Sequence, residues 1–64
     1  MVSEILVKDL KNSIGRVITI YLESGFKHRC EIISVDEEYV KIKDIIKDRI
    51  KLLRLNQIIE VNGI

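Results

Sequence analysis

The stretch that decides the fold reads Val17-Ile18-Thr19-Ile20-Tyr21-Leu22-Glu23-Ser24-Gly25. Within it, Ile18, Ile20 and Leu22 occupy every second position, so they share one face of an extended strand. A glycine ends this run, and a second alternating run follows directly and continues to Val35-Asp36. Two such runs joined through a glycine turn predict a β-hairpin. The aliphatic face of the first strand should belong to the core.

The segment before the hairpin predicts a short helix. Ser3 can cap it, and the apolar residues that follow recur at three- and four-residue spacing, which lays one stripe across a sheet. Asn12-Ser13 should end the helix, and Gly15 permits the turn into the first strand. We expect the helix to pack through Leu6, Val7 and Leu10.

Three further strands are predicted after the hairpin, at 39–43, 50–55 and 58–61. The second hairpin strand becomes apolar on both faces from Ile33, which is typical of a bent or bulged strand. The chain is therefore predicted to be all-β, a small, strongly bent, five-stranded antiparallel barrel with a short N-terminal helix. The predicted core residues are Ile18, Ile20, Ile32, Val40, Ile42 and Leu53.

Length and composition agree with one small β-rich domain over residues 1–64. The chain has 13 isoleucines and no proline, alanine or tryptophan, and β-branched side chains favour strands. A chain this short buries only about 60% of its unfolded surface, so neighbouring subunits can contribute to its stability.

Charge and cysteine content limit the function classes. Eleven basic and ten acidic residues give a net charge of +1, which is no general reason to bind phosphate backbones. No apolar run approaches the ~20 residues of a membrane span, so no membrane partner is expected. The single cysteine excludes an internal disulfide, and no export signal is recognised at the N-terminus. These features predict a cytoplasmic protein.

The spacing of several of these residues resembles that of the Sm-like family, which includes archaeal Sm-like proteins and bacterial Hfq. The family's first motif is similar to the series Leu10, Gly15, the alternating strand, Gly25, Ile32 and Asp36, and its second motif to Leu53-Arg54-Leu55-Asn56-Gln57-Ile58 followed by Val61. Two family glycines are replaced here, by Cys30 and Leu55. The resemblance implies an SH3-type barrel that assembles into a homo-oligomeric ring of six or seven subunits and holds single-stranded U- or A-rich RNA.

Aligned without gaps, the family's base-reading asparagine falls on Val40 and its stacking residue on Glu38, and neither can do that work. One extra residue in the Asp36 turn instead places Tyr39 at the stacking position and Lys41 at the asparagine position. Alternation favours this register, because the other would bury two lysines. With Arg54, which the second motif keeps, the expected RNA-binding residues are Tyr39, Lys41 and Arg54.

Other readings of these residues stay open. Tyr39 and Lys41 can be ordinary exposed strand residues, and Arg54 can form an ion pair with the next subunit. The rival function is an Sm-fold structural or protein-interaction module that has lost the RNA pocket. A small DNA-binding SH3-like barrel is a weaker alternative, because its outer sheet should be strongly basic.

No catalytic or metal site is predicted. His28 and Cys30 lie two residues apart, but a zinc site needs about four ligands and the chain has no other cysteine or histidine. A Cys–His nucleophilic pair would need an orienting third group and an oxyanion hole. We therefore expect Cys30 to fill the core and His28 to be a polar face residue, with no cofactor and no enzymatic activity.

Overall fold

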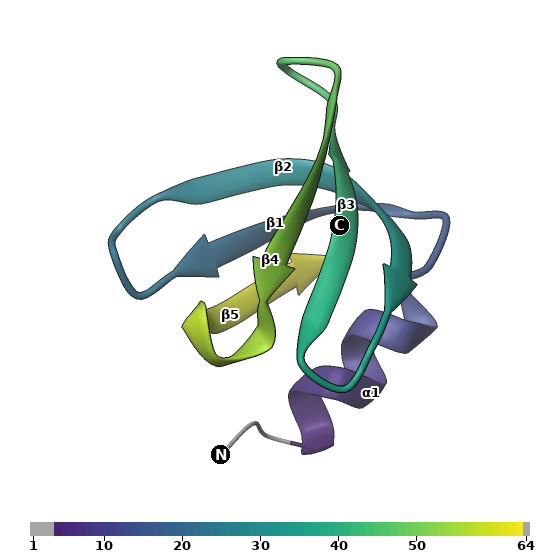
Figure 1. Ribbon diagram of the computed structural model, residues 1–64, viewed down its shortest axis with the longest axis vertical. Coiled ribbons are helices and arrows are strands. Elements are labelled where there is room, and N and C mark those ends of the chain that lie inside the picture. Colours follow the sequence, from purple (N-terminus) through teal and green to yellow (C-terminus); the bar gives the residue numbers. More distant parts are fainter. Residues whose placement is uncertain (1–3, 64) are drawn as a thin grey trace.

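A computed structural model describes residues 4–63 (Figure 1). The elements in chain order are α1 (Glu4–Asn12), β1 (Val17–Leu22), β2 (Lys27–Val35), β3 (Tyr39–Asp44), β4 (Arg49–Arg54), the 3-10 helix η1 (Leu55–Gln57) and β5 (Ile58–Gly63). The predicted helix and all five predicted strands are thus present, with ends that differ by one or two residues. The expected cap at Ser3 lies outside the described residues.

The five strands form one antiparallel sheet in the order β4-β3-β2-β1-β5. The strands at the two ends of this order, β4 and β5, are not paired with each other in the described chain, so the sheet is not closed. The prediction of a mostly β fold with an N-terminal helix is confirmed in this form. Within residues 4–63, no helix has the length and apolar character needed to cross a bilayer.

The sheet bends where its pairing register shifts. In the β2–β3 pair the shift falls between Ile32 and Ser34, and it leaves Ile33 without a directly paired residue. This is the position at which the sequence predicted a bulge, because a bulge is how a strand can change its buried side. A second shift, between Tyr21 and Leu22, occurs in the β1–β5 pair. Figure 1 shows β2 arching over the molecule.

The core lies inside the curve of the sheet. Five of the six predicted core residues are buried, whereas Leu53 is only partly buried and packs against them. Leu10 of α1 is fully buried, and Leu6 and Val7 pack beside it, so the predicted face of the helix is correct. The complete set of buried apolar residues is Leu10, Ile18, Ile20, Cys30, Ile32, Val40, Ile42, Leu55 and Ile58.

Leu55 is the main residue that the sequence pattern missed. The chain turns into η1 directly after β4, and Leu55 is 1% exposed. Its backbone N–H donates to the carbonyl oxygen of Glu38 at 2.8 Å, which ties η1 to the β2–β3 turn. Period-two alternation predicts only the faces of a continuing strand, so it could not anticipate a helical turn that points the next leucine inward.

Candidate functional site

Tyr39 and Arg54 meet across the β3–β4 pair. Tyr39 is the first residue of β3 and Arg54 the last residue of β4, and the two are direct partners in the register. The Arg54 guanidinium carbon lies 6.0 Å from the centroid of the Tyr39 ring, at the outer limit of a cation–π contact. Tyr39 is half-buried and Arg54 exposed. The structure therefore brings two of the three predicted site residues together.

Lys41 lies on the same outer face, one pair further along the strands. It is two residues after Tyr39 and is the partner of Leu52 on β4. Val40 and Ile42, its neighbours in the chain, are fully buried, so Tyr39 and Lys41 both face outward. This agrees with the orientation that alternation predicted. Residues two apart on a strand are separated by about 7 Å, so Lys41 can reach a ligand that also contacts Tyr39.

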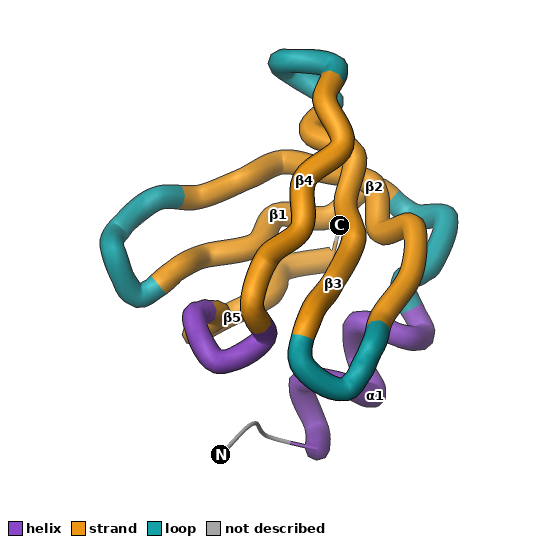
Figure 2. The backbone as a smooth tube through the Cα atoms, in the orientation of Figure 1, coloured by secondary structure: helices purple, strands orange, loops and turns teal. Residues whose placement is uncertain are grey.

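The turns around this pair are connected by backbone hydrogen bonds. The N–H of Asp36 donates to the carbonyl oxygen of Tyr39, and the N–H of Leu55 donates to that of Glu38, both at 2.8 Å. Figure 2 shows the β2–β3 turn and η1 at the same end of the sheet. Tyr39 and Arg54 are thus held by strand pairing on one side and by two linked turns on the other, which limits their movement before any ligand binds.

The charge around the pair is not strongly positive. Lys41 and Arg54 supply two cations, whereas the turn before Tyr39 contains the exposed carboxylates of Asp36, Glu37 and Glu38. Phosphate groups would gain little from such a field. The arrangement suits contacts with the face and edge of an unpaired base, because stacking does not depend on net charge.

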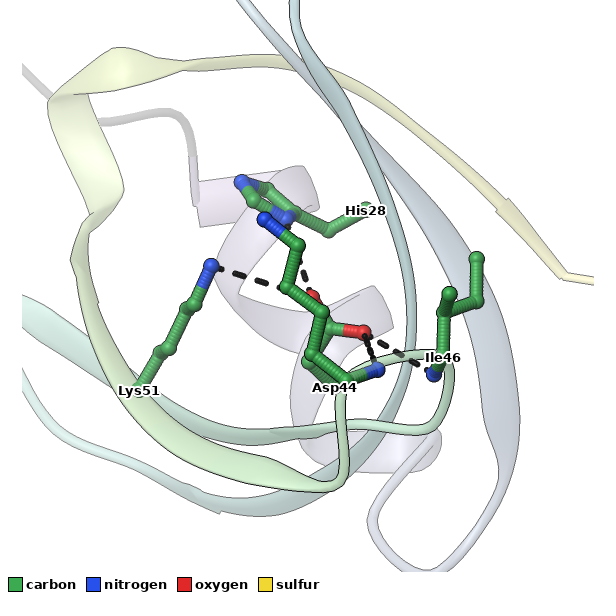
Figure 3. Close-up of polar contacts among 5 residues, drawn as sticks. His28, Asp44, Ile46 and Lys51 are labelled. Atoms are coloured by element: carbon green, nitrogen blue, oxygen red, sulfur yellow. Dashed lines mark hydrogen bonds and ion pairs between the residues drawn. The ribbon is translucent and has the colours of Figure 1, made fainter.

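A second polar cluster lies at the other end of β3 (Figure 3). Asp44, the last residue of β3, is 4% exposed, and one of its carboxylate oxygens lies 3.7 Å from both His28 Nδ1 of β2 and Lys51 Nζ of β4. The other oxygen accepts the backbone N–H groups of Ile46 and Lys47 at 3.0 and 3.1 Å. One carboxylate therefore links three strands and organises the β3–β4 turn.

These contacts stabilise the charged form of Asp44. The N–H of Lys47 is the largest cause that lowers the pKa of this carboxyl below its ordinary value, and burial opposes it. The N–H of Ile46, the Lys51 ammonium and His28 lower the pKa further. Sequence reasoning did not single out Asp44. Its signal is an aspartate at the end of an alternating strand, where its side chain can accept N–H groups from the following turn.

Cys30 and His28 do not form a reactive pair. Cys30 is fully buried, and burial, followed by the negative charge of Asp44, raises the pKa of its thiol to about 11. A thiol with this pKa is almost entirely protonated at neutral pH and is a poor nucleophile. Among the described residues, no group of three or more His, Cys, Asp or Glu side chains is placed to hold a metal ion.

A surface groove of about 520 Å³ lies between α1 and the β2–β3 turn. Its lining comes from Val7, Lys8 and Lys11 and three neighbouring polar residues, Glu4, Asn12 and Glu37. None of the three predicted site residues lines it. Two lysines and two glutamates balance in charge, so the groove by itself indicates no class of ligand.

No family model matches the chain, and no curated protein matches it.

Proposed function

We propose that this chain is an RNA-binding module of the Sm-like type, which forms a homo-oligomeric ring and holds single-stranded U- or A-rich RNA. The observation that carries the proposal is the Tyr39–Arg54 pair, an aromatic ring and a guanidinium in direct register on the outer face of the sheet. Such a pair offers one surface for stacking and one group for hydrogen bonds to a base edge. Lys41 adds a flexible donor beside it.

Ring formation is supported by the two unpaired edges. β4 and β5 end the strand order, and each carries an exposed apolar side chain, Leu52 at 62% and Ile59 at 66%. Backbone groups and apolar side chains at an edge favour pairing with another chain. If β4 of one subunit pairs with β5 of the next around a closed rotation, every edge is covered and the small sheet completes its barrel with a neighbour.

Binding of short oligo-U and oligo-A, measured by fluorescence anisotropy at fixed salt, tests the site. Tyr39→Ala removes a stack and should cost about 1–3 kcal/mol per base, and Arg54→Ala should weaken binding as well. Lys27→Ala is the matched control, because Lys27 is an exposed cation at the far end of β2. Lys51 is unsuitable as a control, since it pairs with Asp44.

The salt dependence distinguishes a stacking site from general attraction. Each phosphate contact to a single strand contributes about 0.7 to the slope of log K against log salt. If the phosphates contact only Lys41 and Arg54 beside the Tyr39 side chain, the slope per subunit should be shallow. Equal losses for Lys27→Ala and Arg54→Ala would mean general electrostatics, and no binding by the wild-type protein would refute the RNA function.

The second candidate is a structural or protein-interaction module of the same fold. Exposed Ile50 and Leu52 on β4 favour it, because they form an apolar stripe beside Arg54 that RNA does not need. Native mass spectrometry with and without nuclease separates the two functions. Co-purifying RNA that nuclease removes supports the first, and an unchanged ring mass without RNA supports the second.

A further inference from the structure

The β3–β4 tip, defined here as residues 43–51, projects away from the rest of the sheet (Figure 1). Three isoleucines in it are exposed to solvent, Ile46 at 77%, Ile50 at 55% and Ile45 at 41%. Exposed apolar side chains gathered at one protruding turn indicate a surface of interaction rather than an ordinary loop, which is usually polar.

The tip also concentrates the positive charge of the chain. It contains four of the 11 basic residues and two of the ten acidic ones, so its formal charge is +2, whereas the remaining 55 residues sum to −1. Both of its carboxylates are engaged within the tip, Asp44 with Lys51 and Asp48 with Lys43 at 3.4 Å. Lys47, in the turn, and Arg49, the first residue of β4, are both exposed.

The apex is held in place before it meets any partner. Asp44 accepts the N–H groups of Ile46 and Lys47, and the N–H of Ile45 donates to the carbonyl oxygen of Arg29 at 3.3 Å. A fixed turn that carries exposed apolar and cationic side chains loses little conformational entropy when it binds.

We propose that the β3–β4 tip binds the surface of an anionic lipid membrane. Ile45 and Ile46 enter the boundary between headgroups and acyl chains, while Lys47 and Arg49 remain at the level of the lipid phosphates. This division matches the two properties of the tip, because apolar burial and attraction to anionic lipids act together at a membrane surface. The contact is peripheral and needs no membrane-spanning segment.

The shape and the charge of the tip together favour a lipid surface as the occupant. The tip protrudes, so it has no groove or pocket of its own that could receive a helix or a peptide side chain. A nucleic acid would use the cations, but isoleucines offer a base no flat face for stacking. A lipid surface requires only that the apolar apex be convex and flanked by positive charge.

The tip can be tested with a fluorescent reporter, because the chain contains no tryptophan. In Ile46→Trp, the emission should shift to the blue when vesicles of phosphatidylcholine and phosphatidylglycerol are added, and brominated lipids should quench it. Ile5→Trp, at an α1 position that is 75% exposed, is the control and should show neither effect. The protein should bind vesicles of phosphatidylcholine alone much more weakly, because these carry no anionic lipid to attract its cationic side chains.

Co-sedimentation with the same vesicles measures how much each substitution weakens vesicle binding. Ile46→Asp should weaken binding about tenfold or more, whereas Ile5→Asp should have little effect. Lys47→Glu should also weaken binding, and more at low salt. The assay contains no RNA, so its result is independent of the proposed RNA function.

Three outcomes would overturn the proposal. Equal binding of Ile46→Asp and wild type would mean plain electrostatic adsorption. A change of subunit number in Ile46→Asp, measured by light scattering, would make the tip a contact between copies. A loss of oligonucleotide affinity in Lys47→Glu with no loss of vesicle binding would assign the basic residues to nucleic acid.

Discussion

At the scale of single residues, Asp44 shows how one carboxylate can organise its surroundings. It accepts two backbone N–H groups and lies near cationic or polar side chains from β2 and β4. Since these contacts favour the ionised form, the folded state lowers the pKa of Asp44 relative to the unfolded state. A group of this kind stabilises the fold above its unfolded pKa of about 3.9 and loses that contribution as the pH falls through the folded pKa.

Asp44→Asn should therefore lower the urea midpoint at pH 7, because the side chain keeps its shape and loses its charge. The difference from wild type should shrink as the pH falls below about 4, where the unfolded wild-type chain takes up a proton at Asp44, and it should vanish below the lower pKa of the folded state. Urea unfolding followed by circular dichroism across this range is the measurement. Asp48→Asn is the control, since Asp48 is exposed and its φ of 53° suits asparagine. A difference that stays constant down to pH 2 would contradict the role of the Asp44 charge.

At the scale of elements, the turn between β1 and β2 depends on Gly25. Its φ is +93°, in the left-handed region, and its N–H donates to the carbonyl oxygen of Leu22 at 3.0 Å. A Cβ built at this position meets no atom within 4 Å, so space is not the reason for glycine. The backbone conformation is the reason, because side chains with a Cβ resist it.

Gly25→Ala should reduce the free energy of unfolding by about 1–2 kcal/mol, which is the ordinary cost of a left-handed residue with a Cβ. For a chain of this size that is a large part of the total stability. The urea midpoint measures the loss, and Ser24→Ala in the same turn is the control and should change it little. A neutral Gly25→Ala would show that the turn can relax into another conformation.

At the scale of the whole molecule, the two edge strands determine how the chain meets its copies. Leu52 is 62% exposed on β4, so Leu52→Lys should leave the monomer fold intact while placing a charge on the proposed contact. We expect fewer subunits per particle in native mass spectrometry, because the added charge opposes pairing at the β4 edge. The urea midpoint should fall with the loss of the neighbouring subunits that stabilise the folded chain. Ile5→Lys on α1 is the control for an added exposed lysine.

Light scattering of the wild-type protein measures its mass in solution and can therefore contradict the proposed assembly. A monomer at micromolar concentration would remove the basis for a ring. A ring that tolerates Leu52→Lys would instead mean that subunits meet through other surfaces than the β4 edge.

The sequence by itself determined where the helix and the five strands lie and which face of β1 and of β3 is buried. The alternation at Val17–Leu22 and Tyr39–Asp44 and the turn at Gly25 all appear in the structure, because these features depend on residues close together in the chain. The helix α1 follows from a local spacing in the same way. The bend near Ile33 was also predicted from the sequence, because a strand that changes its buried side usually contains a bulge.

Only the tertiary structure decided which distant residues meet. The register of β3 and β4 places Tyr39 opposite Arg54, and the meeting of three strands places His28 and Lys51 around Asp44. The turn of η1 moves Leu55 into the core. Pairing register and long-range packing depend on the whole sheet, so a local period of two residues carries no information about them.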